Sequence, residues 1–291
     1  MRILLFGNTG QLGWELERSL SPLGPLHAVD FPQVNLAEPE SCVVVIRDFH
    51  PQVIVNATAY TAVDRAESES DLVMAINAIG PGILMEEALR IKAALIHYST
   101  DYVFDGSKSA AYIESDIPNP LSVYGKSKLA GEQAIRQVGD AYLTLRTAWV
   151  YSLRRDSFVT KVLAWARSQP ALKIVNDQVS NPTWARLLAD TTALLLARAG
   201  EDALGWITEH KGLYHLAGDG YASRYDWAKA ILSFDPRSSE QVVKEVLPAL
   251  TSEFPTPAQR PLFSALNCGH FKETFGLALP DWKTALKLAM T

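Results

Sequence analysis

The chain has 291 residues, 48% of them hydrophobic and 20% charged, and a formal net charge of −5. This length can bury a large core and suits one large α/β unit or two closely joined domains, and the composition is that of an ordinary globular protein. The negative charge gives no electrostatic reason to expect nucleic acid binding.

The first predicted element is a short buried strand over residues 2–6, followed by a glycine-rich turn and a helix over residues 14–20. The turn places glycines at Gly7, Gly10 and Gly13. Glycines permit a tight turn and a close approach of backbone N–H groups to a pyrophosphate, which the helix N-terminus also attracts. A strand before the motif and a helix after it therefore favour dinucleotide binding.

A dinucleotide site also requires an acid about twenty residues further on, at the end of the second strand, to bind ribose hydroxyls. Asp30 ends the predicted strand that includes residues 27–29 and meets this requirement. The alternative is that Asp30 only begins the turn before Pro32. A carboxylate here would repel a 2′-phosphate, which favours NADH without excluding NADPH.

The rest of the first half alternates between helices and strands, as in a doubly wound parallel sheet of the Rossmann type. We expect Gly80 and Pro81 to bend the long helix in this region. The predicted elements are a helix over 38–49, a strand over 53–56, a helix over about 70–92, a strand leading from 93 toward Thr100, and a strand over 142–146.

Beyond Ser152 the alternation becomes less regular, which predicts a smaller C-terminal lobe that binds substrate. We therefore divide the chain into a dinucleotide-binding domain over 1–150 and a substrate-binding lobe over 151–291, with helices from about 184–209 free to rejoin the first domain. Periodicity predicts further helices over 155–168, 184–199, 225–233 and 281–290.

The main catalytic candidates are Tyr124 and Lys128, which share a face if residues 121–132 are helical. An ammonium beside a phenol lowers the phenol pKa, and proton transfer works best when that pKa approaches the operating pH. Thr100, at the carboxyl end of a strand, could hold the same substrate oxygen. The spacing alone is not specific, because Tyr225 and Lys229 share it, but only Tyr124 follows a strand end beside the nucleotide motif.

The remaining composition predicts a cytoplasmic protein without a catalytic metal. Cys42 and Cys268 form no disulfide framework, and the six histidines show no metal-binding spacing. We find no signal peptide and no stretch long and apolar enough to span a bilayer. We expect no membrane partner, and the sequence leaves the oligomeric state open, a homodimer included.

Together these motifs resemble the dTDP-4-dehydrorhamnose reductase family of extended short-chain dehydrogenases/reductases. The resemblance extends from residue 1 to near residue 267, and Thr100 in place of the serine of many relatives fits this subgroup. The similar segments are Ser99–Gly106, Asn119–Lys128, Asn176–Gln178 with Pro182-Thr183, and Arg260-Pro261 with Ser264 and Leu266-Asn267.

The resemblance implies that NADPH or NADH reduces the C4 ketone of dTDP-4-dehydro-L-rhamnose to dTDP-L-rhamnose, for lipopolysaccharide or O-antigen synthesis. Tyr124 would donate the proton, Thr100 would bind the reacting oxygen and Lys128 would stabilise the phenolate. The implied cofactor-binding residues are Gly7, Gly10, Gln11, Leu12, Gly13, Asp30, Asn35, Leu36, Ala59, Tyr60, Thr61, Tyr124 and Lys128; the implied substrate-binding residues are Thr100, Asp101, Trp149 and Arg260.

Asn35 and Leu36 replace an acidic and aromatic pair that some relatives have, and Val179-Ser180-Asn181 replaces a glycine-containing loop. Two other functions remain open at this point. One is a nucleotide-sugar epimerase, dehydratase or different ketoreductase on the same scaffold. The other is a non-catalytic dinucleotide-binding regulatory subunit, against which the intact Thr100, Tyr124 and Lys128 argue.

Overall fold

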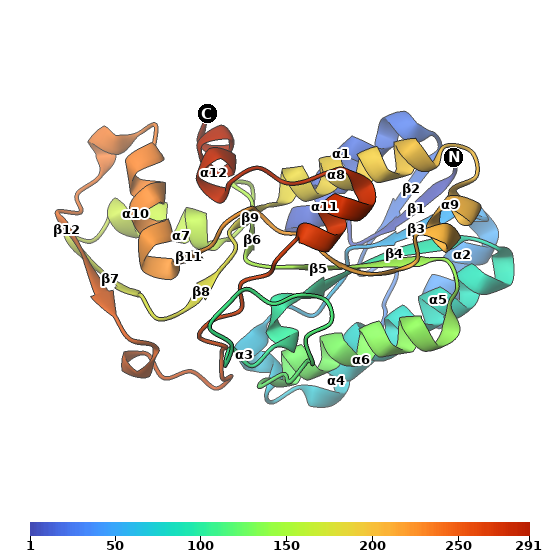
Figure 1. Cartoon of the computed structure of the whole chain (residues 1–291), viewed down its shortest axis with the longest axis horizontal. Coiled ribbons are helices and arrows are strands. Elements are labelled where there is room, and N and C mark those ends of the chain that lie inside the picture. The colour runs from blue at the N-terminus through green and yellow to red at the C-terminus, as the bar shows by residue number, and fades with distance from the viewer.

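A computed structural model describes all residues, 1–291, and its centre is a six-stranded parallel sheet (Figure 1). The strand order is β10-β5-β4-β3-β1-β2, so successive strands are added on opposite sides of β1. The strands are β1 (Ile3–Phe6), β2 (Leu26–Val29), β3 (Val53–Asn56), β4 (Ala94–Thr100), β5 (Tyr142–Thr147) and β10 (Gly212–His215). Ligands in such sheets bind where the order reverses, outside the carboxyl ends of β1 and β3.

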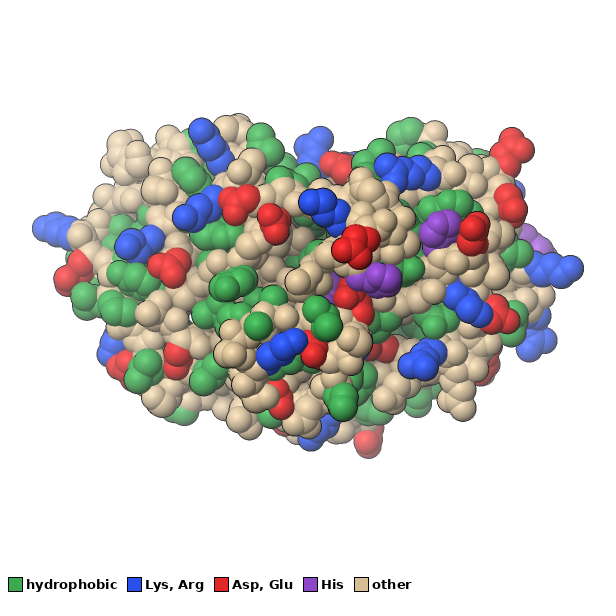
Figure 2. Space-filling view, in the orientation of Figure 1, with side chains coloured by type: hydrophobic (Ala, Val, Ile, Leu, Met, Phe, Trp, Pro, Cys, Tyr) green, Lys and Arg blue, Asp and Glu red, His purple; other side chains and the backbone are tan.

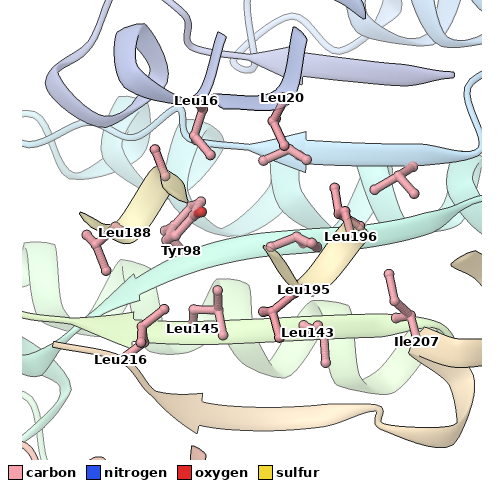
Figure 3. Close-up of a cluster of buried hydrophobic side chains, with 14 of the residues drawn as sticks. Leu16, Leu20, Tyr98, Leu143, Leu145, Leu188, Leu195, Leu196, Ile207 and Leu216 are labelled. Atoms are coloured by element: carbon pink, nitrogen blue, oxygen red, sulfur yellow. The ribbon is translucent and has the colours of Figure 1, made fainter. Parts of the chain in front are cut away.

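Helices cover both faces of the sheet, which explains why its strands are nearly continuous apolar runs (Figure 1). One face is covered by α1 (Gln11–Leu20), α8 (Ala185–Ala199), α9 (Ala203–Glu209) and α11 (Gly269–Phe275), which contribute to a single buried cluster. Figure 3 shows leucines of α1 and α8 meeting strand side chains there. The other face is covered by α2 (Glu40–Phe49), α5 (Gly80–Ile91) and α6 (Val123–Val138).

The second lobe has its own core, built around the fully buried Trp227. Its sheets are small and two-stranded, pairing β7 with β12, β8 with β11 and β6 with β9. The elements are β6 (Val150–Tyr151), α7 (Phe158–Ala166), β7 (Ala171–Val175), β8 (Val179–Ser180), β9 (Thr183–Trp184), β11 (Ala222–Ser223), α10 (Arg224–Phe234), β12 (Glu245–Ala249) and α12 (Trp282–Met290).

Short helices complete the chain: η1 (Ser21–Leu23), α3 (Val63–Ala66), α4 (Ser70–Met74), η2 (Ala75–Ile79), η3 (Asp101–Val103), η4 (Ser238–Glu240) and η5 (Thr251–Glu253). The predicted long helix over 70–92 consists of α4, η2 and α5, and η2 is a π-helical segment just before Gly80 and Pro81. Widened turns of this kind are frequent at functional sites. Here the widened turn carries Asn77 into contact with two neighbouring segments.

The α/β class and the doubly wound parallel sheet are confirmed. The expectation that no stretch is long and apolar enough to span a bilayer is wrong. The helical stretch Ser70–Ile91 has the required length and a mean hydropathy of 1.4. This is weak evidence for a membrane, because 56% of the apolar window is buried inside the protein, as in a core helix. Figure 2 shows acidic and basic side chains interspersed over one face of the molecule, with no continuous basic stripe.

Candidate active site

A cavity of about 620 Å³ opens at the carboxyl ends of β1, β3, β4 and β5. This is the edge of the sheet where the strand order predicts a ligand. Its lining residues are Gly7, Thr9, Gly10, Gln11, Leu12, Asp30, Ala57, Thr58, Ala59, Thr61, Tyr98, Ser99, Thr100, Asp101, Tyr124, Lys128, Thr147, Ala148, Trp149, Val150, Arg155 and Asp156. We call this cavity the crevice.

The glycine turn between β1 and α1 forms one wall of the crevice. Gly7 has a φ of +89°, which side chains rarely permit. A Cβ at Gly13 would lie 1.9 Å from the carbonyl oxygen of Gly7, so α1 can pack against the turn only with glycine there. No side chain caps the N-terminus of α1 at Gly10. Gly10, Gln11 and Leu12 line the crevice, so this end of the helix brings there the partial positive charge that favours a phosphate.

The polar lining of the crevice suits a ligand with many hydrogen-bonding atoms. Three buried oxygens of lining residues have no hydrogen-bond partner within the protein: Gln11 Oε1, Thr58 Oγ1 and Thr147 Oγ1. Buried polar atoms are rarely left unpaired in folded proteins. Together with the glycine turn, they fit a dinucleotide lying across the strand ends.

Asp30 lines the crevice and is held by the glycine turn. The N–H and the hydroxyl of Thr9 donate to Asp30 Oδ2 at 3.1 and 2.5 Å. On the other side of Thr9, the guanidinium of Arg155 donates to the Thr9 carbonyl oxygen. The crevice wall therefore carries a cation, Arg155, close to a carboxylate.

Tyr124 and Lys128 lie one turn apart on α6, and both line the crevice with Thr100. Ser122 begins α6 by accepting a hydrogen bond from the N–H of Gly125 at 3.1 Å. Asn77 also holds this first part of α6, because its amide donates a hydrogen bond to Ser127 Oγ at 3.0 Å. The helix N-terminus that presents Tyr124 is therefore held in place by both local and distant contacts.

The pKa of Tyr124 is raised in this structure, whereas the sequence predicts that it is lowered by Lys128. Burial raises the pKa of the Tyr124 phenol, and the Thr100 hydroxyl beside it only partly opposes that effect. The amine of Lys128 donates instead to the carbonyl oxygen of Tyr98 at 2.7 Å and lies 3.2 Å from His97 Nε2. Tyr124 is therefore held as a protonated phenol, which is the form that can donate a proton.

Trp149 lines the crevice in a strained backbone conformation. Its φ of +41° is unusual for a bulky side chain, and such strain often occurs at functional sites. The indole stacks on Trp227 with ring centroids 5.5 Å apart, and the guanidinium of Arg224 lies 3.7 Å from its ring centroid. Burial lowers the pKa of Arg224 to about 10, so it stays charged at neutral pH.

A second cavity, of about 500 Å³, lies in the C-terminal lobe on the other side of Arg224. We call it the lobe pocket. Its lining combines aromatic rings with two arginines, which suits a flat ring joined to an anion. The lining residues are Phe158, Trp165, Gln169, Leu172, Lys173, Ile174, Val175, Gln178, Arg224, Thr251, Phe254, Thr256 and Arg260.

Two polar clusters join the lobe to the sheet next to these cavities. The carboxylate of Asp101 accepts hydrogen bonds from Ser180 and Ser264 at 2.9 and 2.5 Å. Arg260 forms an ion pair with Asp64 at 2.8 Å, which lowers the pKa of that carboxyl. Asp101 and Arg260 therefore both have protein partners that hold the lobe against the first domain.

The structure brings together in the crevice most of the residues predicted from sequence, and it places the others elsewhere. Arg260 lines the lobe pocket instead. Tyr60 lies beside the crevice, where its hydroxyl donates to Glu69. Leu36 is buried in the core, and Asn35 holds the turn before α2 by accepting from the N–H of Ala37 at 3.0 Å. Gly13 packs against Gly7 behind the lining.

Comparison with known proteins adds a second line of evidence. The family model described as "RmlD substrate binding domain" matches residues 1–291. A dTDP-4-dehydrorhamnose reductase of Burkholderia thailandensis is 42% identical over all of this chain and 98% of its own, and one of Escherichia coli strain K12 is 40% identical over 99% and 96%. The chain belongs to the dTDP-4-dehydrorhamnose reductase family.

Solved structures of this reductase family share the fold over the whole chain. A dTDP-4-dehydrorhamnose reductase of Clostridium acetobutylicum has a TM-score of 0.91 at 33% identity and covers 100% of this chain and 98% of its own. One from Bacillus anthracis, solved in complex with NADP, has a TM-score of 0.88 at 30% identity and covers 99% and 97%. The recognition from sequence is thus confirmed, and the members named here are oxidoreductases.

Sequence reasoning missed several residues that the structure places at or behind the site. Arg155, Asp156 and Arg224 have no motif that marks them, because loops and a distant helix bring them in. His97 and Asn56 could have been found from the sequence. Each is polar in a buried parallel strand, and the register pairs them directly.

Proposed function

We propose that this protein uses NADPH or NADH to reduce the C4 ketone of dTDP-4-dehydro-L-rhamnose, forming dTDP-L-rhamnose. The observation that carries the proposal is that Thr100, Tyr124 and Lys128 line the same crevice as the uncapped glycine turn. The phenol of Tyr124 and the hydroxyl of Thr100 thus lie where a nicotinamide ring would be held. Relatives of this chain are named for this reaction.

Each polar residue of the crevice has a role in this proposal. The bound cofactor supplies the hydride. The Tyr124 hydroxyl gives its proton to the oxygen as negative charge develops on it, and the Thr100 hydroxyl donates a hydrogen bond to the same oxygen. Lys128 then stabilises the phenolate. Thr147 and Ser99, at the ends of β5 and β4, add further polar groups to the crevice lining.

The glycine turn would bind the pyrophosphate through Gly10, Gln11 and Leu12, and Asp30 would bind the adenosine ribose. The Bacillus anthracis relative was solved with NADP, so we infer that either reduced cofactor can serve here. Ala59 and Thr61 line the crevice, and their small side chains would leave room for the cofactor to cross β3. Asn35, Leu36, Tyr60 and Gly13 would support this site from behind.

The substrate would span Trp149, with its sugar in the crevice beside Asp101 and its base and phosphates in the lobe pocket. Aromatic rings and the Arg224 cation support this assignment. Arg260 would bind the diphosphate while it stays in its ion pair with Asp64. Residues 1–150 would then hold the dinucleotide and residues 151–291 the nucleotide sugar, with α8, α9 and β10 returning to the sheet.

We further infer that the protein works in the cytoplasm, where activated sugars and reduced nicotinamides are made. Its partner is the nucleotide-sugar substrate, and a homodimer is compatible with the sheet-and-lobe fold. The product would enter lipopolysaccharide or O-antigen synthesis.

The test is to mix the purified chain with dTDP-4-dehydro-L-rhamnose and either reduced cofactor. The loss of the reduced cofactor's absorbance is followed, and the sugar product is identified. We expect one cofactor oxidised for each dTDP-L-rhamnose formed. An epimerase would instead change the sugar without net cofactor oxidation, and a regulatory subunit would bind the dinucleotide without turnover. Either result would refute the proposal.

A further inference from the structure

Two cations line the crevice, and only one of them has a role in the proposed reduction. Lys128 lies one turn from Tyr124 on α6 and serves the proton donor. The other cation is Arg155, whose guanidinium donates a hydrogen bond to the carbonyl oxygen of Thr9 in the glycine turn. Arg155 thus brings a positive charge to the part of the crevice that would hold the dinucleotide.

A short loop with both ends fixed carries Arg155 to the glycine turn. It follows β6 and runs from Ser152 to Ser157, which are both buried. The Ser157 hydroxyl donates to the Ser152 carbonyl oxygen at 2.9 Å and also caps α7. Between these ends, the guanidinium of Arg154 lies 4.3 Å from the ring centroid of Trp14 on α1. Packing at both ends and on α1 therefore holds Arg155 beside the glycine turn.

The guanidinium of Arg155 has hydrogen-bond donors to spare. Its partner is one neutral carbonyl oxygen, and it belongs to none of the chain's ion pairs. A guanidinium has five N–H donors in a planar fork. That fork matches the oxygens of a phosphate, which arginine binds through two parallel hydrogen bonds. Because Arg155 is also exposed, an anion in the crevice can reach it.

Thr9 places this cation next to the acid that is expected to bind the adenosine ribose. The N–H and the hydroxyl of Thr9 donate to Asp30 Oδ2, and the carbonyl oxygen of Thr9 accepts from Arg155. One residue of the turn thus contacts both charges. In dinucleotide-binding folds, such an acid binds the 2′-hydroxyl of NADH, whereas a nearby arginine accommodates the 2′-phosphate of NADPH. This chain has both groups.

A phosphate beside Asp30 needs a compensating cation. A phosphate monoester carries a charge of about −1.5 to −2 at neutral pH, and the carboxylate repels it. Lys128, the other cation of the lining, is already engaged on α6, where its amine donates to the carbonyl oxygen of Tyr98 at 2.7 Å. Arg155 is therefore the lining cation that is available to a phosphorylated ribose.

The pyrophosphate is the alternative target of Arg155, but it has another source of positive charge. Gly10, Gln11 and Leu12 bring the uncapped N-terminus of α1 to the crevice, where it attracts a phosphate without any cationic side chain. Both cofactors also share the pyrophosphate. An arginine bound there would not distinguish NADPH from NADH.

We propose that Arg155 binds the 2′-phosphate of NADPH and is the residue that lets this crevice accept NADPH although Asp30 favours NADH. This inference rests on the proposed function, because it assigns a residue to the cofactor of that reaction. Asp30 then binds the free 2′-hydroxyl of NADH, and Arg155 offsets the repulsion between Asp30 and the 2′-phosphate of NADPH. The choice of cofactor therefore depends on a residue outside the half of the chain that carries the glycine turn.

Calorimetric titration with ADP-ribose and 2′-phospho-ADP-ribose isolates this contact. Both ligands lack nicotinamide, so nothing is turned over, and they differ only in the 2′-phosphate. We expect Arg155→Met to raise the Kd for 2′-phospho-ADP-ribose at least about tenfold, as for loss of a charged hydrogen bond, and to change the Kd for ADP-ribose by less than about twofold. An equal loss of affinity for both ligands would place the guanidinium at the shared pyrophosphate and would overturn the proposal.

Arg154→Met is the matched control, because it removes the same charge from the same loop. The Arg154 guanidinium lies on Trp14, and neither residue lines the crevice. We expect both Kd values to stay within about twofold of those of the unmodified protein, as for an exposed charge without a direct contact. If Arg154→Met and Arg155→Met weakened 2′-phospho-ADP-ribose equally, the general charge of the loop would attract the phosphate, and the proposal would be wrong.

Turnover is judged separately from these titrations. If the purified chain binds 2′-phospho-ADP-ribose through Arg155 but does not reduce the sugar, the proposed function is wrong and the assignment of Arg155 stands. If the chain reduces the sugar with either cofactor, and Arg155→Met leaves both Kd values and the ratio of kcat/KM for NADPH to that for NADH unchanged, the function stands and the assignment of Arg155 is wrong.

Discussion

The crevice and the lobe pocket meet at the stacked pair of Trp149 and Arg224, yet they are built in different ways. Most of the crevice lining follows directly on the carboxyl ends of four parallel strands, and backbone groups of the glycine turn form part of its surface. The lobe pocket draws its lining mainly from α7, β7, α10 and the tail over 251–260, and its charges are the side chains of Lys173, Arg224 and Arg260.

This difference shows how the two halves of a site can be specified separately. The sheet edge fixes the crevice because strand ends cannot move without breaking the core. The lobe pocket depends on side chains that distant segments bring together. We therefore expect substitutions in the crevice to change turnover or cofactor use, and substitutions in the lobe pocket to change the KM for the nucleotide sugar.

The largest effect should come from Tyr124→Phe, which removes the proton donor and keeps the ring. We expect kcat to fall by at least about 10²-fold, as for loss of a general acid. Cofactor affinity, measured by fluorescence titration, should stay nearly unchanged. The matched control is Tyr225→Phe, because Tyr225 has the same spacing to Lys229 but lies on α10 outside both cavities. Equal turnover in the two variants would remove the catalytic role of Tyr124.

Arg224→Met should separate the lobe pocket from the crevice. It removes the guanidinium that lies over Trp149 and lines the lobe pocket. Hydrogen bonds to charged groups contribute about 1.5–3 kcal/mol, so we expect the KM for the nucleotide sugar to rise by about 10- to 100-fold. Steady-state kinetics should show little change in the KM for the reduced cofactor.

Arg237→Met is the control for that experiment, because Arg237 lies in the same lobe with its side chain 66% exposed and pairs only with Glu240. Its KM values should match those of the unmodified protein. If Arg224→Met instead weakened the cofactor and left the sugar unaffected, the assignment of the lobe pocket to the substrate would be wrong.

The same contrast explains which parts could be predicted from sequence. The sheet, the glycine turn and the position of Tyr124 follow from local patterns, because a buried strand, a turn and a helix cap each have a short sequence signature. The strand ends then place Asp30 and Thr100 at one edge. Sequence reasoning thus identified most of the crevice but not its electrostatics, because the effect of burial on the pKa of Tyr124 depends on residues packed around it.

The lobe pocket and the contacts that join the lobe to the sheet could not be predicted in this way. Arg260 was predicted to bind substrate, but its ion pair with Asp64 joins residues 196 positions apart. Likewise, the hydroxyls of Ser180 and Ser264 reach Asp101 from two separate segments. No local pattern records such contacts, since they exist only after the chain has folded.

Gly10, at the N-terminus of α1, and Gly13, inside α1, can show whether packing or ligand binding requires each glycine of the crevice wall. Gly13→Ala would place a Cβ against the backbone of Gly7, whereas at Gly10 the nearest contact, the Gly7 oxygen, lies at an ordinary 3.4 Å. We expect Gly13→Ala to lower the free energy of unfolding by about 1–3 kcal/mol, as overpacking does. Gly10→Ala should change it by less than about 0.5 kcal/mol but weaken cofactor binding. Chemical denaturation followed by circular dichroism measures both, and equal stabilities would show that the turn can relax.

The smallest expected effect concerns the choice between the two cofactors. Asp30→Asn keeps an oxygen for the N–H of Thr9 but removes the negative charge that would face a 2′-phosphate. We expect the ratio of kcat/KM for NADPH to that for NADH to rise by up to about tenfold, equivalent to about 1.4 kcal/mol. Asp156→Asn, in the same lining but on the loop after β6, should leave this ratio unchanged. If both variants shift the ratio equally, the overall charge of the crevice selects the cofactor, and Asp30 has no specific contact with the ribose.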